Sequence, residues 1–184
     1  MAEYYLISQL PSLDGLSDNS PLPITVERFK ELCSTANKKV LSELDSLTLV
    51  PPADAKERTS ALINSWNKGE SDLRLALCKV RAEKMKKSFD LQNRILSPEL
   101  LKTATTATEI KNPLEAENFL LQYRLSFLET LRPTDNFSDD FIFYYGLRLM
   151  VISRIRQFDT ELGETTYKNI YNSIINGDNS EALQ

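Results

Sequence analysis

The sequence predicts an all-α fold of long antiparallel helices that form an elongated helical bundle. Its 184 residues include only five glycines against eight prolines, so long segments without a helix breaker are separated by loops that contain proline. Apolar side chains recur at helical spacing along these segments, and runs of alternating β-branched residues are few. Hydrophobic residues make up 41% and charged residues 26% of the chain, which is typical of a packed domain. We therefore expect a single helical domain over residues 1–184 that buries its core without disulfides.

The N-terminal segment contains one element whose type the spacing does not decide. Residues 4–10 are apolar enough for a short strand or for a half-turn of helix. Residues 11–23 are rich in Ser, Asp, Pro and Gly, as in a surface loop, and Thr25 then stands where it can cap a helix. A second short helix is predicted over residues 37–47.

Two longer helices are predicted in the middle of the chain, on either side of Gly69. After Pro51 and Pro52, which cannot continue a helix, one is expected over residues 54–68 with Gly69 as its end. The other is expected over residues 71–96, where no breaker occurs and apolar residues recur every seven positions. We expect this helix to form half of a long helical hairpin.

The predicted helix over residues 71–96 is basic, although the net charge of the chain is -4. On a continuous helix, four of its basic residues lie on one side, away from the apolar stripe: Arg81, Lys84, Lys87 and Arg94. Two interpretations are open for this basic face. It is solvated, with Glu83 and Lys87 as an i,i+4 pair, or it is a docking face for an acidic partner.

A complete helix-start signal precedes the predicted central helix. Residues 97–99 begin a short helix, and residues 103–108 are expected to form its frayed end or a linker because threonine has a low helix propensity. Asn112 then stands at an N-cap position and Pro113 at the first helical position. This start predicts a helix up to Leu131, with apolar residues on more than one side.

The next predicted helix starts after Ser138 and reaches about Phe158. Ser138 can cap it, and the charges of Asp139 and Asp140 are favoured by the helix dipole in the first turn. Its apolar run over residues 141–152 is well short of the roughly 20 residues that span a bilayer, so it predicts a buried core helix.

Arg148 interrupts this apolar run. Burying a guanidinium without a partner costs several kcal/mol, on the order of the penalty for any buried ion. We therefore expect Arg148 to form a structural ion pair with a carboxylate, and contact with a partner protein is the alternative.

A final helix is predicted over residues 164–175, with Gly177 just past its end and residues 177–184 as a mobile tail. The domain has an alternative division into two lobes, at about residues 1–68 and 71–176.

The sequence contains no recognisable catalytic constellation, and we expect the protein not to be an enzyme. The absence of histidine excludes the serine and cysteine triads that use it and the histidine sites for zinc. No glycine-rich phosphate loop occurs. Two carboxylate pairs, Asp139-Asp140 and Asp159 with Glu161, are chemically able to share acid–base work, but their positions suit helix starts and loops. No catalytic, cofactor-binding or metal-binding residue is expected.

Charge, cysteines and the N-terminus indicate a cytoplasmic protein that does not bind nucleic acid. A net charge of -4 and a pI near 5.1 leave no general excess of Lys and Arg for phosphate groups. The opening residues lack the basic region of a signal peptide. Cys33 and Cys78 are far apart and are expected to be small buried hydrophobic side chains. Any connection to a membrane is expected to be made through a partner.

Two stretches at opposite ends of the chain resemble a known family. The first is Tyr4-Tyr5-Leu6, followed by Leu10-Pro11. The second comprises Asn112-Pro113-Leu114-Glu115, Phe137-Ser138-Asp139-Asp140, Tyr145-Gly146-Leu147-Arg148-Leu149, Arg154, and Phe158-Asp159 with Glu161 and Gly163. In order and spacing they are similar to a bacterial family that is encoded with the components of V-type (A-type) ATPases. Its members are regarded as counterparts of the component that joins the central stalk to the membrane ring in V-type ATP synthases and in the eukaryotic enzymes. The resemblance covers about half of the chain, and the family members are longer.

The resemblance implies a non-catalytic rotor component of an ATPase that moves protons or sodium ions. Such a component is helical and funnel-like, sits on the membrane ring and receives the central stalk. The implied partners are therefore the other V-type ATPase subunits of the stalk and the ring, and the implied location is peripheral at the inner face of the membrane, through these partners. The basic residues of the predicted long helix would then contact acidic surfaces of the neighbouring stalk or ring. A general helical adaptor unrelated to ATPases is the alternative.

Overall fold

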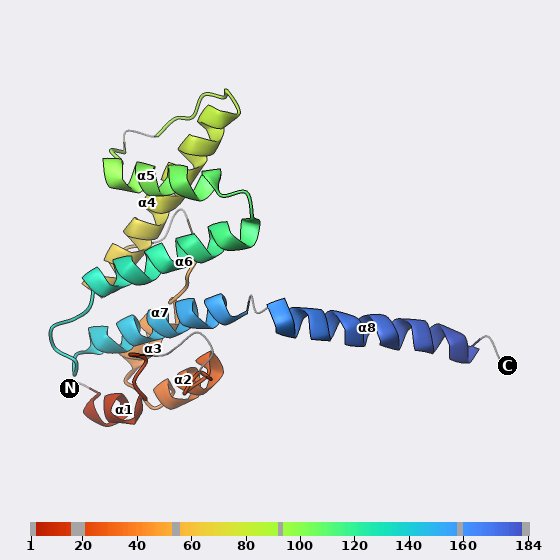
Figure 1. Cartoon of the computed structure of the whole chain (residues 1–184). Coiled ribbons are helices and arrows are strands. Elements are labelled where there is room, and N and C mark those ends of the chain that lie inside the picture. The colour runs from red at the N-terminus through yellow and green to blue at the C-terminus, as the bar shows by residue number, and fades with distance from the viewer. Residues whose placement is uncertain (1–2, 16–20, 53–55, 92–93, 158–159, 182–184) are drawn as a thin grey trace.

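The computed structural model describes residues 3–15, 21–52, 56–91, 94–157 and 160–181, and it confirms the predicted all-α class (Figure 1). The described residues form helices and no strand. The helices are α1 (Tyr4–Gln9), α2 (Val26–Cys33), α3 (Lys38–Asp45), α4 (Ala61–Lys84), α5 (Pro98–Glu109), α6 (Pro113–Thr130), α7 (Asp139–Arg156) and α8 (Thr160–Glu181). None of these helices, as far as they are described, is long and apolar enough to cross a membrane.

The helices are arranged as a stack that α4 crosses. Helix α5 packs on α6 and α6 packs on α7, while α4 contacts both ends of this stack, α5 and α7. Helices α2 and α3 cover α7 from the other side, and α8 extends away from the other helices (Figure 1). This crossing arrangement does not confirm the expected elongated antiparallel bundle.

Side-chain caps explain where most of the helices begin. In each case, a side-chain oxygen accepts a hydrogen bond from a backbone N–H of the first turn, which would otherwise lack a partner. The capping residues are Thr25, Asn37, Ser60, Ser97, Asn112 and Ser138. The predicted starts of α6 and α7 are thus confirmed, and the undecided opening segment is helix α1.

Helix α4 runs through Gly69, so the predicted stop at this residue is wrong. A Cβ atom at Gly69 would lie 2.4 Å from the ring of Phe127 on α6, closer than real side chains approach. The absence of a side chain therefore permits the contact between α4 and α6, and the glycine does not end the helix.

The predicted helix over residues 71–96 is also wrong, because α4 ends at Lys84. The N–H of Lys87 donates to the carbonyl of Ala82 at 2.9 Å and that of Lys86 to Glu83 at 3.0 Å, which is the hydrogen-bond pattern of a Schellman motif. Lys86 adopts the left-handed conformation that this motif requires, with φ 55°. Glycine usually occupies this position, so a lysine here carries no signal that the helix ends.

Further predicted boundaries differ from the structure. Helix α4 begins at Ala61, after the cap Ser60, and not at residue 54 as predicted. Helix α5 continues through the threonine-rich segment 103–108 because Thr103 and Thr105 bond back to carbonyls of the preceding turn and Ala104 is fully buried. Helix α8 runs past Gly177 to Glu181, and residues 182–184 of the expected mobile tail lie outside the described residues.

The apolar side chains form two cores that share α4 and α6. The larger core contains α1, α2, α3, α7 and the start of α4, including Trp66. The smaller core contains α5 and the later part of α4, including Leu73 and Ala76. Leu121 of α6 belongs to the first core and Leu120 to the second, so α6 contributes to both.

The two cysteines lie in different environments. Cys33 is buried, as expected, and burial raises the pKa of its thiol to about 11. The expectation for Cys78 is wrong, because this side chain is exposed on α4.

Candidate functional site

The first candidate site is the junction of the N-terminal segment with α6 and α7, which we call the junction site. The guanidinium of Arg148 on α7 lies 2.6 Å from the carboxylate of Asp14 and 3.3 Å from that of Glu129 on α6. The Arg148 side chain is only 18% exposed. It thus meets two carboxylates, and the pair with Asp14 joins residues 134 positions apart.

Two tyrosines of α7 extend the junction site. The hydroxyl of Tyr144 donates to Glu129 at 2.7 Å, and that of Tyr145 donates to the carbonyl of Pro11 at 2.8 Å. Burial, and then the hydrogen bond to Glu129, raise the pKa of Tyr144 to about 12, and burial raises the pKa of Tyr145 to about 12. Both hydroxyls therefore stay protonated at neutral pH and act as hydrogen-bond donors.

A cavity of about 310 Å³ opens beside these groups. Its walls include apolar side chains such as Ile7 and Phe141 together with Arg132 and Arg148. Asp14 and Glu129 already lie near both guanidinium groups, so little positive charge is left for an anionic ligand. The junction site therefore holds the N-terminal segment on α7.

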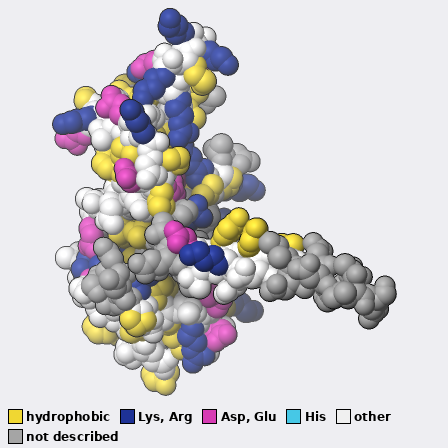
Figure 2. Space-filling model, turned by 45° about the vertical axis from the view of Figure 1, so that its right-hand side comes forward, with side chains coloured by type: hydrophobic (Ala, Val, Ile, Leu, Met, Phe, Trp, Pro, Cys, Tyr) yellow, Lys and Arg dark blue, Asp and Glu magenta, His cyan; other side chains and the backbone are white. Residues whose placement is uncertain are grey.

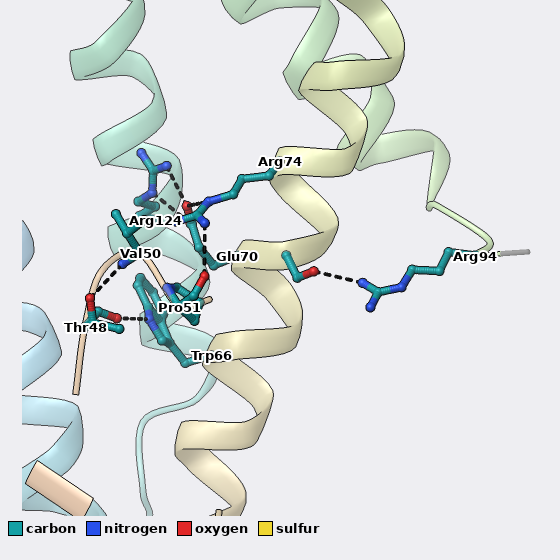
Figure 3. Close-up of polar contacts among 9 residues, drawn as sticks. Thr48, Val50, Pro51, Trp66, Glu70, Arg74, Arg94 and Arg124 are labelled. Atoms are coloured by element: carbon teal, nitrogen blue, oxygen red, sulfur yellow. Dashed lines mark hydrogen bonds and ion pairs between the residues drawn. The ribbon is translucent and has the colours of Figure 1, made fainter. Parts of the chain in front are cut away.

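The second polar group surrounds Glu70 on α4 (Figure 3). On this helix, Glu70 lies between Trp66 of the larger core and Leu73 of the smaller core. Arg124 of α6 donates two hydrogen bonds to the Glu70 carboxylate, at 2.9 Å and 2.8 Å, and Arg74 donates a third at 3.2 Å. Arg74 also donates to the carbonyl of Pro51 at 3.1 Å. The carboxylate of Glu70 is thus fully engaged, as a buried charge requires.

These contacts shift the titration of Arg124 in the direction expected of a buried pair. Burial alone would lower the pKa of its guanidinium, but the hydrogen bonds and the charge of Glu70 outweigh burial and raise it. The cluster around Glu70 therefore joins α4, α6 and the segment before α4, and we assign it a structural role.

The third group is the C-terminal end of α4, where the four predicted basic residues do not form one helix face. Arg81 and Lys84 lie in the last turn of α4 and Lys87 follows its end, whereas Arg94 folds back on Ser71 at 2.9 Å and Asp72 at 3.4 Å (Figure 3). The ammonium of Lys84 donates to the carbonyl of Thr108 at 2.7 Å, which caps the end of α5. Arg94 also borders a cavity of about 530 Å³ beside α4.

Of the two carboxylate pairs noted in the sequence, the structure describes only Asp139-Asp140. Asp139 and Asp140 lie in the first turn of α7, and Asp140 accepts a hydrogen bond from Ser60 at 2.7 Å. Asp159 lies outside the described residues, as does the side chain of Glu161. Within the described ranges, no group of three or more His, Cys, Asp or Glu side chains could hold a metal ion.

No known protein family, curated protein or solved structure matches the chain.

The feature that the sequence-based prediction missed is an apolar stripe on α8, formed by Tyr167, Tyr171 and Ile174. These side chains are 67%, 52% and 59% exposed, and the rings of Tyr167 and Tyr171 stack at 6.1 Å. Their spacing of i, i+4 and i+7 places them on one side of the helix. This spacing is visible in the sequence, but only the structure shows that α8 leaves it uncovered.

Proposed function

We propose that this chain is a non-catalytic connector in a V-type (A-type) ATPase, where it links the central stalk to the membrane ring during proton or sodium ion transport. The observation that carries the proposal is the exposed apolar stripe of α8, a helix of 22 residues that extends from the helical body (Figure 1). The sequence resemblance supplies the identity of the assembly.

The stripe of α8 suits a helical partner. Residues at i, i+4 and i+7 are the usual anchors when an amphipathic helix binds in an apolar groove of another protein. Burial of these exposed apolar side chains against a partner would contribute about 25 cal/mol for each Å² of apolar surface removed from water. We therefore assign the stripe to a groove between helices of the central stalk.

The junction site supports the same proposal in a different way. The stretches that carry the resemblance lie far apart in the sequence, yet Tyr145 bonds to Pro11 and the ring of Tyr4 packs against that of Phe137 at 5.4 Å. The opening of the chain and its α6–α7 region thus form one structural unit. A connector that transmits force between partners gains from such a fixed terminus.

The test is co-purification of the full-length tagged chain from the cells that produce it. We expect the catalytic and ring proteins of the ATPase to accompany the chain. The variant Tyr167→Ser/Tyr171→Ser/Ile174→Ser should lose the stalk proteins. The matched control Asn169→Ser/Asn172→Ser changes exposed polar residues of the same helix and should retain them.

Two other outcomes would change the conclusion. Co-purification of a partner that is not part of an ATPase, lost in the stripe variant, would favour the general helical adaptor. Retention of every ATPase protein by the stripe variant would contradict the role of α8 and leave the connector function to another surface.

A further inference from the structure

We propose that the end of α4 is a contact site for an anionic lipid surface. We call this site the α4 tip and define it by the basic side chains of Arg81, Lys86 and Lys87 and the apolar side chains of Met85 and Phe89. It lies at the far end of the molecule from α2 and α3 (Figure 1). This proposal does not depend on which protein binds α8.

The α4 tip concentrates positive charge in an acidic protein. Residues 79–90 contain five Lys or Arg and two Asp or Glu, which gives a net charge of +3, whereas the whole chain has -4. Figure 2 shows Lys and Arg side chains gathered over this end of the molecule. Such a cluster attracts phosphate groups of anionic lipids, and the attraction weakens as salt screens it.

Three of these cations have no structural task in the described part of the chain. The side chains of Arg81, Lys86 and Lys87 are exposed and form no hydrogen bond or ion pair with another described residue. Lys84 differs from them because it caps α5, so it is not counted in the site.

Lys86 adds an independent observation. Its backbone lies in the left-handed region, with φ 55°, which glycine adopts without the steric penalty that a Cβ atom causes. Lys86 therefore lowers the stability of the fold relative to glycine at this position, while it adds a positive charge to the tip. Residues held in such conformations are concentrated at functional sites.

Apolar side chains beside the cations favour a lipid surface over an acidic protein. Met85 is 60% and Phe89 39% exposed. Met85 directly follows the basic last turn of α4, and Phe89 lies four residues further along the chain. Lipid headgroups offer negative charge, and the acyl boundary below them accepts apolar side chains. An acidic protein surface offers negative charge but no apolar layer for Met85 and Phe89.

The shape of the tip also favours a lipid surface. The two cavities described above are lined by none of the tip residues. A projecting end that lines neither of these cavities suits a flat, deformable surface better than it suits a peptide, which binds in a groove.

The test is co-sedimentation of the full-length chain with vesicles. The probes are vesicles of phosphatidylcholine alone and of phosphatidylcholine with phosphatidylglycerol, each at low and high salt. We expect binding to the anionic vesicles only, and weaker binding at high salt. Replacing Arg81, Lys86 and Lys87 together by Gln should lower the partition coefficient on the order of 100-fold, since each basic residue near such a surface contributes about a factor of five.

Two further variants complete the design. The control replaces Lys30, Lys38 and Lys39 by Gln, which changes the net charge equally on exposed residues of α2 and α3 and should leave the partition coefficient within a few fold. The variant Met85→Ser/Phe89→Ser keeps the charge and should still weaken binding. Thermal melts of each variant confirm that the fold is retained.

Three results would overturn the proposal. The first is equal loss of binding in the control, because net charge alone would then explain the effect. The second is binding to both kinds of vesicle with no dependence on the tip. The third is binding of polyglutamate through the tip cations without binding of anionic vesicles, which would assign the tip to an acidic polypeptide.

Discussion

The buried carboxylate of Glu70 on α4 accepts two hydrogen bonds from the guanidinium of Arg124 on α6. Glu70 is 3% exposed, and the pair lies where the two apolar cores meet. Removal of the cation would leave a buried charge with only Arg74 near it. The variant Arg124→Leu should therefore lower the free energy of unfolding by about 3 kcal/mol, measured by urea denaturation.

The double variant Glu70→Leu/Arg124→Leu provides the control for this prediction. Replacing both charges by apolar side chains removes the uncompensated carboxylate, so a large part of the lost stability should return. A double variant that is less stable than Arg124→Leu alone would show that the cost comes from lost packing instead of the unpaired charge.

Gly69 and Gly163 should respond in opposite ways to alanine. At Gly69, a Cβ atom would lie 2.4 Å from the ring of Phe127, so Gly69→Ala should destabilise the fold by about 1–3 kcal/mol through overpacking. At Gly163 on α8, a Cβ atom meets nothing within 4 Å, so Gly163→Ala should be neutral or raise helicity. Denaturation and circular dichroism measure the two effects. Equal behaviour of the two variants would contradict the close approach of α4 and α6.

Lys86→Gly should stabilise the protein, although it removes a side chain. The left-handed φ of 55° costs a residue with a Cβ atom about 1 kcal/mol relative to glycine. The neighbouring Lys87→Gly lacks this gain, since Lys87 does not have a positive φ, and serves as the control. Thermal melts compare the two variants, and a loss of stability in Lys86→Gly would contradict the Schellman ending of α4.

The pair Asp14 and Arg148 should contribute modestly to stability. Their atoms lie 2.6 Å apart, but the Asp14 side chain is largely exposed, and solvent screens such pairs. A double-mutant cycle with Asp14→Asn and Arg148→Met should give a coupling energy of about 0.5–1 kcal/mol. Limited proteolysis should also cleave the N-terminal segment faster in Arg148→Met. No coupling would mean that Glu129 alone holds Arg148.

Alkaline pH should weaken the fold through Tyr144 and Tyr145. Both have a pKa of about 12 in the fold against an ordinary value of 10.0, so the unfolded chain loses these protons first. Their stabilising contribution is complete below pH 10.0 and declines as the pH rises towards about 12. Urea denaturation at a series of pH values should show this decline. The variant Tyr144→Phe/Tyr145→Phe should show a smaller decline in stability over the same pH range. An identical decline in the variant would mean that other titratable groups cause it.

The elements predicted correctly from the sequence are helices whose starts are determined by side chains of neighbouring residues. Asn112 and Ser138 cap α6 and α7 through their own side chains, so the two starts were predictable without knowledge of the rest of the fold. The buried run of α7 was predictable as well, because its apolar residues leave no polar face.

The failures came from positions that tertiary contacts decide. Gly69 lies inside a helix because Phe127, 58 positions later, occupies the space of its side chain, and Lys86 ends a helix without the glycine that normally marks this ending. Arg94 was placed on a helix face but lies beside Ser71, because the chain turns back after α4. The apolar stripe of α8 has a visible spacing, but whether another helix covers it depends on the whole fold.

Helix α4 makes the two cores a single cooperative unit. Trp66 belongs to the larger core and Leu73 to the smaller one, and the anchored carboxylate of Glu70 stands between them. Neither core can unfold alone without breaking this helix at its most firmly held turn, so both should melt in one transition. The same continuity makes α4 a lever of about 36 Å, at 1.5 Å for each residue. A displacement at its C-terminal end should therefore be transmitted along the helix to α7, on which α4 packs.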